Sequence, residues 1–167
     1  SFSSTSSDAT INFINAISLE NTGPSNRVVD VNNGSAAVDA RLSGVISQGG
    51  ETHGLTKTGA GTLELTAANT YRGPTLVEAG TLLINGNQST ATGSVSVAAG
   101  ASLGGTGVIG GDLALASGAR LALGFGLTSV NGPTVAGTTT LNGIVTVVPA
   151  MLGGSIAPGT YTILNYN

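Results

Sequence analysis

The stretch LTKTGAGTLELTAANTYRGPTLVEAGTLLING, residues 55–86, decides how this chain of 167 residues folds. Its segment TLEL (62–65) alternates polar and apolar residues, which is the pattern of a half-buried β-strand. GTLEL (61–65) recurs later in the stretch as GTLLI (80–84), so a glycine and an apolar strand repeat together. The stretch therefore predicts short strands that repeat at an interval of roughly 20 residues.

Short strands of the same kind are predicted on both sides of this stretch. Their apolar residues recur at period two, in TINF (10–13), RVVDV (27–31), SVSV (94–97), DLAL (112–115), RLAL (120–123) and IVTVV (144–148). SVSVAAGASL (94–103) superposes on DLALASGARL (112–121), with Gly100 on Gly118 and Leu103 on Leu121. Clusters of Gly, Asn, Pro and Ser between the strands are typical of turns, and no segment has the period of a capped helix.

Repetition of this kind predicts a β-solenoid, in which each coil buries its apolar face against its neighbours. A sandwich or jelly roll also consists of many short strands, but neither fold explains why the sequence resembles itself roughly every 20 residues. We therefore predict one all-β domain over residues 1–167, a parallel β-helix with single-stranded coils of about 20 residues. About eight coils of that length would fill the chain.

The composition excludes several classes of function. The chain has 27 glycines, 8% charged residues and a net charge of -3, and its five Lys and Arg residues are scattered, so no nucleic-acid partner is expected. No apolar run approaches the roughly 18 residues of a membrane helix. The absence of cysteine removes disulfides, thiolate metal sites and cysteine nucleophiles. Residues 1–9 do not have the pattern of a signal peptide, so any export signal is expected upstream.

The stretch 55–86 closely resembles the passenger-associated β-strand repeat of bacterial autotransporters. The typical form of that repeat is L-T-K-x-G-x-G-T-L-x-L-x-x-x-N-T-Y-x-G-x-T-x-V-x-x-G-T-L-x-V-N-G. The residues that match it are Leu55, Thr56, Lys57, Gly59, Gly61, Thr62, Leu63, Leu65, Asn69, Thr70, Tyr71, Gly73, Thr75, Val77, Gly80, Thr81, Leu82, Asn85 and Gly86. Arg72 and Pro74 stand where small residues are frequent, a departure confined to the loop after Tyr71.

This resemblance implies a right-handed parallel β-helix that is a fragment of a longer secreted passenger. It implies a structural stalk segment without enzymatic activity, which assists passenger export and folding at the bacterial cell surface. The implied partner is the passenger's own outer-membrane translocator barrel, outside this chain. An adhesin or self-associating biofilm protein is the alternative, with a host surface, a glycan or a second copy as partner, and a glycan-cleaving β-helix enzyme is a third possibility.

One glycine motif needs a separate interpretation. GTGVIG (105–110) has the G-x-G-x-x-G form of a dinucleotide-binding loop. Such a loop requires a following helix and an acidic residue about 20 positions later, and here a strand pattern follows and no acid occurs after Asp112. We therefore predict a corner between two coils, with Val108 and Ile109 as a short strand on the intervening face, and no cofactor.

Three further sets of residues are candidates for a site. His53, with Glu51 nearby, is the only histidine, and its glycine-flanked position predicts a solvated loop residue. A catalytic cluster of a glycan-cleaving enzyme could at most combine Asp30 and Asp39 with Arg27 and Arg41. Sparse charges on a solenoid are usually solvated, so we expect these residues to lie on the surface. Aromatic or guanidinium contacts to a sugar or partner could come from Tyr71, Arg72, Tyr161 and Tyr166.

Packing explains the aromatic residues more simply, because Tyr71 belongs to the repeat and the last two tyrosines could cap a terminal coil. The segment GGDL (110–113) lacks the spaced glycine and aspartate of a calcium-binding solenoid turn. We therefore predict no catalytic, cofactor-binding or metal-binding residue, and the sequence leaves any binding residues unknown.

Overall fold

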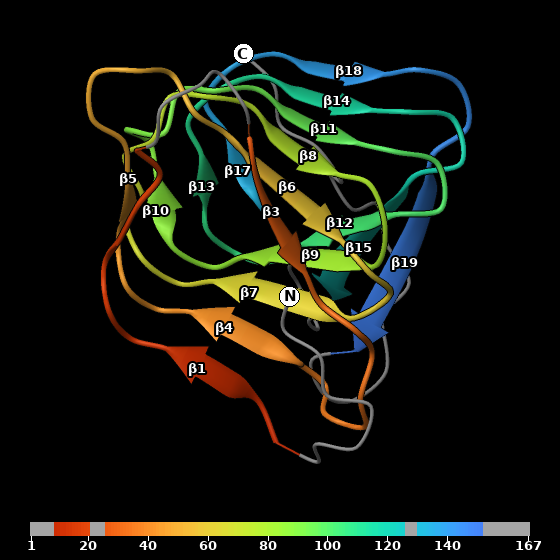
Figure 1. Ribbon diagram of the computed structural model, residues 1–167. Helices are drawn as coiled ribbons and strands as arrows, with labels where there is room; N and C mark the ends of the chain where they lie inside the picture. Colours follow the sequence, from red (N-terminus) through yellow and green to blue (C-terminus); the bar gives the residue numbers. More distant parts are fainter. Residues whose placement is uncertain (1–8, 21–25, 126–129, 152–167) are drawn as a thin grey trace.

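Strands and turns make up the fold. A computed structural model describes residues 9–20, 26–125 and 130–151. In these ranges the chain winds through three faces (Figure 1). Most of the side chains enclosed between these faces are apolar. None of the described residues belongs to a helix that could span a membrane.

The first face is an eight-stranded sheet. Its parallel strands are β1 (Ile11–Phe13), β4 (Ala40–Leu42), β7 (Thr62–Leu65), β9 (Thr81–Ile84), β12 (Ser102–Gly104), β15 (Arg120–Phe125) and β19 (Thr146–Met151). The remaining strand, β16 (Val130–Asn131), pairs antiparallel with the end of β15. Each parallel strand comes from a later coil than the one before it.

The second face is a six-stranded parallel sheet, and the third consists of very short strands. The second face contains β3 (Arg27–Asp30), β6 (Leu55–Thr58), β8 (Thr75–Val77), β11 (Val95–Val97), β14 (Leu113–Leu115) and β18 (Thr139–Leu141). On the third face β2 (Ile17–Ser18) pairs with β5 (Ile46–Ser47), and β10 (Asn87–Gln88), β13 (Val108–Ile109) and β17 (Thr134–Val135) form a separate sheet. This winding confirms the all-β parallel solenoid.

The strand register confirms the repeats found in the sequence. Thr62 pairs with Thr81, as the match between GTLEL and GTLLI predicts, and Val95 pairs with Leu113, as the superposition of the two later segments predicts. The outer coils are longer, since β1 pairs with β4 and β14 pairs with β18 across wider gaps in the sequence. A coil of about 20 residues is therefore correct for the centre, whereas the outer coils of the described part are longer.

The core consists of equivalent side chains stacked from coil to coil. On the first face Leu63, Leu82, Leu103 and Leu121 are register partners in successive strands, and each is at most 1% exposed. Burying a leucine of this kind stabilises a fold by roughly 1.5–3 kcal/mol. Because each coil packs mainly against the next, stability is distributed along the solenoid axis.

A column of glycines lets the corners before the second face approach closely. The column consists of Gly73, Gly93, Gly111 and Gly137. A Cβ on each of the last three would lie 1.9–2.8 Å from the backbone of the preceding glycine. Only a residue without a side chain leaves room for this backbone-to-backbone contact, which explains why glycine recurs at this corner.

Candidate functional site

The polar residues of the stretch 55–86 that belong to the repeat motif lie mostly inside the solenoid. Lys57 in β6 is a register partner of Val29 in β3 and Val77 in β8, both of which point into the core. Its side chain is 0% exposed. A lysine thus occupies an inward position in a column of valines.

The Lys57 ammonium is held by three backbone carbonyl oxygens. Nζ donates to the carbonyls of Thr58 at 2.6 Å, Gly59 at 2.8 Å and Ala79 at 3.1 Å. The first two belong to the end of β6 and the corner after it, and the third belongs to the corner between β8 and β9. Lys57 therefore connects the corners of two consecutive coils.

Two carboxylates connect the same corner, residues 58–62, to the preceding coil. Thr58 donates its hydroxyl to Asp30 Oδ1 at 2.8 Å. Asp39 accepts from the backbone N–H of Thr62 at 2.7 Å and from that of Gly34 at 2.6 Å. We call residues 58–62 the repeat corner, and it is bonded to the coils on both sides.

A second buried group follows β7. Tyr71 is 1% exposed, and its hydroxyl is 2.6 Å from Thr75 Oγ1 in the core of the second face. Burial raises the pKa of Tyr71, so the phenol is neutral over the physiological range. Asn69 Oδ1 accepts from the backbone N–H of Ile46 at 2.8 Å and so bonds to the preceding coil.

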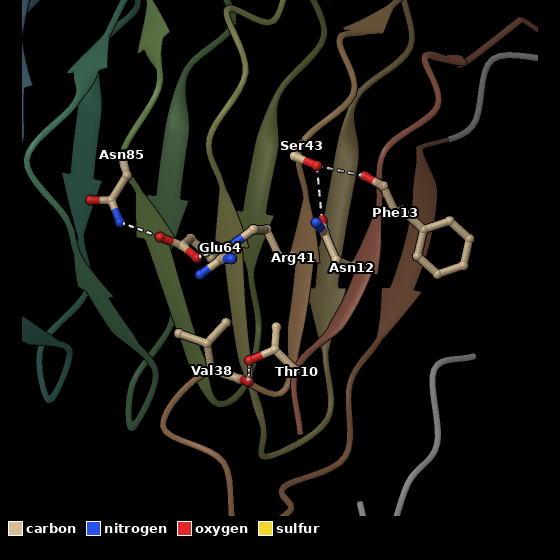
Figure 2. A network of polar contacts seen from close by, with 8 residues as sticks. All are labelled: Thr10, Asn12, Phe13, Val38, Arg41, Ser43, Glu64 and Asn85. Atoms are coloured by element: carbon tan, nitrogen blue, oxygen red, sulfur yellow. Dashed lines mark hydrogen bonds and ion pairs between the residues drawn. The ribbon is translucent and has the colours of Figure 1, made fainter. Parts of the chain in front are cut away.

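An outward-facing polar network crosses the first face (Figure 2). Arg41 Nε lies 2.5 Å from Glu64 Oε2, and Asn85 Nδ2 donates to Glu64 Oε1 at 2.6 Å. Asn85 Oδ1 in turn accepts from the N–H of Thr106 at 3.0 Å. These contacts join consecutive coils, and the sequence interpretation did not identify Glu64 as a partner of Arg41.

The structure does not assemble the charged cluster considered from the sequence. Arg27 donates to the carbonyl of Leu19 at 3.0 Å from the second face, whereas Arg41 pairs with Glu64 on the first face. Asp30 and Asp39 both bond to the repeat corner, and Asp39 is only 6% exposed. The expectation that these charges are simply solvated is therefore wrong for Asp39, because a buried carboxylate here caps backbone N–H groups.

His53 also differs from its prediction. Its side chain is 0% exposed, because the close glycine corner places it under the next coil, next to Gly73. Among the described residues neither ring nitrogen has a hydrogen-bond partner, and the same holds for Asn69 Nδ2 and Gln88 Nε2. The glycines beside His53 indicate tight packing of backbones, whereas the sequence interpretation took them as a sign of an exposed loop.

The other residues singled out in the sequence analysis lie in a strand, at a corner, on the surface or outside the described residues. Val108–Ile109 form β13 as predicted, and Gly105 lies in the corner before it with a φ of +107°. Arg72 is exposed, while its backbone N–H donates to Gln48 Oε1 at 2.9 Å. Tyr161 and Tyr166 lie outside the described residues. Within the described ranges no group of three His, Cys, Asp or Glu residues could hold a metal ion.

The outer surface of the second face has an open apolar groove over β8, β11 and β14. Its lining residues are Leu76, Val77, Glu78, Ser96, Val97, Ala98 and Ala116. Small side chains on β11 and after β14 lie beside the larger leucine and glutamate of the β8 segment. The groove is one feature of the described surface that could accommodate a partner.

These features define the chain as a segment of a parallel β-helix whose polar residues mostly join one coil to the next. Residues 55–84 match the family model of the passenger-associated-transport-repeat. The chain is also 39% identical, over 144 residues, to the adhesin BmaC autotransporter of Brucella suis biovar 1. It therefore carries an autotransporter passenger repeat.

The match to the Brucella protein covers 67% of this chain but only 4% of the relative. The chain thus spans a small part of the length of the curated relative it matches. No solved structure matches the chain.

The buried lysine makes stability depend on pH. Burial lowers the pKa of Lys57 to about 8, and the charges of Asp30 and Asp39 partly oppose this shift. Between pH 8 and about 10 the folded chain releases this proton while the unfolded chain, with a pKa near 10.5, retains it. The free energy of unfolding should therefore rise with pH in this window, and below pH 8 the lysine is protonated in both states and adds no slope.

Urea unfolding of the wild type and of Lys57→Met between pH 7 and pH 10 measures this effect. The difference between the two chains should grow in favour of the wild type as pH rises above 8. Tyr71 opposes the trend only above about pH 10, because the unfolded tyrosine then ionises first. A difference that stays constant across the window would contradict the prediction.

Proposed function

We propose that this chain is a structural stalk segment of a secreted autotransporter passenger, without catalytic activity, which assists passenger export and folding at the bacterial cell surface. One observation carries the proposal: three polar residues of the repeat, Lys57, Asn69 and Tyr71, are engaged inside the solenoid. Lys57, Asn69 and Tyr71 are buried and bond to backbone or to a core hydroxyl, so they hold coils together and do not face a ligand.

The ends of the described solenoid suit a stalk that continues in both directions. Phe13 is 40% exposed, whereas its register partner Leu42, one coil further in, is 2% exposed. At the other end Leu141 is 49% exposed and its partner Leu115 is 0% exposed. These exposed positions belong to core columns, so a further coil stacked on either end would bury apolar surface in the same way.

The proposal is tested in the full-length passenger, expressed in its native host. Leu82→Asp places a charge in the core column of the repeat, and Leu83→Asp places the same charge at the next, partly exposed position. We expect Leu82→Asp to reduce the folded, protease-resistant passenger on the cell surface several-fold and Leu83→Asp to leave it near wild type. Equal display of both variants at the wild-type level would overturn the proposal.

Adhesion is the second candidate, favoured by the name of the Brucella relative and by the apolar groove on the second face. The test combines Leu76→Lys with Ala98→Lys, which introduces charge into the groove. Thr140→Lys, exposed on β18 of the same sheet, is the matched control. Normal surface display with lost attachment to host cells or matrix in the groove variant alone would favour the adhesin.

A further inference from the structure

We propose that the repeat corner and the equivalent corner of the next coil, between β8 and β9, form a binding site for an ammonium-type monovalent cation, and that Lys57 fills this site from within the chain. The site consists of the carbonyl oxygens of Thr58, Gly59 and Ala79. This inference concerns how two coils are joined, and it does not depend on the role proposed above.

The match between the ammonium and its ligands is complete. A lysine ammonium has three N–H donors and no acceptor, and here three carbonyl oxygens accept at 2.6, 2.8 and 3.1 Å. Within the described ranges Lys57 forms no ion pair, since the one found joins Arg41 and Glu64. The lysine is therefore held by backbone dipoles, as a bound cation would be.

The nearest negative charges do not contact the ammonium. Asp30 Oδ1 accepts from the Thr58 hydroxyl, and both carboxylate oxygens of Asp39 accept from backbone N–H groups. Burial disfavours the charged ammonium, and the fields of the two aspartates partly offset this cost without competing for its hydrogen bonds. These two aspartates are the titratable groups whose charges act on Lys57.

Carbonyl oxygens that converge at the corner of a solenoid require hydrogen-bond donors, which the three N–H groups of the ammonium supply. Removing the ammonium would leave the partly buried oxygens of Gly59 and Ala79 without this donor, and an acceptor with reduced access to water is unfavourable when it has no partner. Other glycine-rich solenoid turns bind calcium from solution. In this chain a covalently attached cation contacts the carbonyl oxygens of the corner, so the corner should form without any added ion.

Chemical rescue tests the proposal. Lys57→Ala removes three methylene groups and the ammonium, and n-propylammonium supplies the same groups. At 100 mM or more of n-propylammonium chloride, the melting temperature of Lys57→Ala should rise by about 2–4 °C relative to equal sodium chloride. The wild type and Lys57→Met, whose sites are filled by a side chain, should not show this increase.

Two controls define the chemistry of the rescue. Tetramethylammonium has the charge but no N–H donor and should not rescue Lys57→Ala, and EDTA should not shift the melting temperature of the wild type. The proposal is overturned if propylammonium has no greater effect on Lys57→Ala than on the wild type. It is also overturned if Lys57→Met is as stable as the wild type at pH 7, where Lys57 carries its proton, because the carbonyls would then need no N–H donor.

A measurement on the wild-type chain covers the case in which Lys57→Ala does not fold. Lys57 is the only lysine in the sequence, so its ε-ammonium has a unique nitrogen-15 signal. Three hydrogen bonds in a buried site should protect the ammonium protons, and their signal should persist at neutral pH and room temperature. Exchange as fast as that of a free lysine would overturn the proposal.

Discussion

Replacement of Gly105 by alanine should destabilise the chain by about 3–5 kcal/mol. The new methyl group would clash with the backbone of the preceding coil, and alanine would also be strained at the positive φ of this position. Gly105 has a φ of +107°, outside the range that residues with a side chain adopt readily. A Cβ at this position would lie 2.1 Å from the carbonyl oxygen of Ile84 in the preceding coil. Both effects act at the corner between β12 and β13, and urea unfolding measures their sum.

Gly100→Ala is the matched control for this prediction. Gly100 also has a positive φ, +79°, but a Cβ there would meet nothing within 4 Å. Its alanine variant should therefore cost only the strain of the backbone, about 1–2 kcal/mol. Equal losses of stability in the two variants would show that contact between coils does not determine the need for glycine at position 105.

The sequence predicted the features of the fold that repeat. The pair GTLEL and GTLLI predicted the register of β7 with β9, and GTGVIG was correctly interpreted as a corner followed by the strand β13. Both predictions rest on local chemistry, because strands alternate and tight corners need glycine. The two-residue strands β5 and β10 were not predicted, since a pair of residues cannot show a period, whereas β13 was inferred from its place between two segments that superpose.

The buried polar residues were harder to predict, although one signal was present. In LTKT (55–58), Lys57 lies two residues after Leu55. Strict alternation along a strand therefore places both side chains on the same inward face. Because lysine usually prefers solvent to a core position, alternation alone does not predict its burial. Its partners are backbone carbonyls of two corners, and no side-chain pattern in a single sequence identifies such partners.

The burial of His53 could not be predicted from its neighbours in the sequence either. Its burial depends on the path of the next coil, which brings Gly73 against its backbone. The sequence contains both glycine-rich segments, but their contact depends on a register between strands one full coil apart, as between β6 and β8. Prediction of burial in a solenoid therefore requires alignment of consecutive coils, because the residues adjacent in sequence are not the ones that cover a side chain.

Replacement of Leu82 by alanine should reduce the free energy of unfolding by about 3–4 kcal/mol. Leu82 is 0% exposed and lies between Leu63 and Leu103 in the core column of the first face, so the smaller side chain leaves a cavity that two coils border. Leu83→Ala, a change of the same size at the next residue, affects a partly exposed side chain and should cost less than about 1 kcal/mol.

The distribution of this loss along the chain distinguishes a solenoid from a domain with a single shared core. In a solenoid each coil contacts its neighbours, so the cavity at Leu82 should lower amide-exchange protection first in β7, β9 and β12. The amides of β14 and β18 lie on later coils and should keep more of their protection. Because coils add to stability locally, a passenger built this way can fold coil by coil, and a uniform loss of protection in the Leu82→Ala chain would contradict that mechanism.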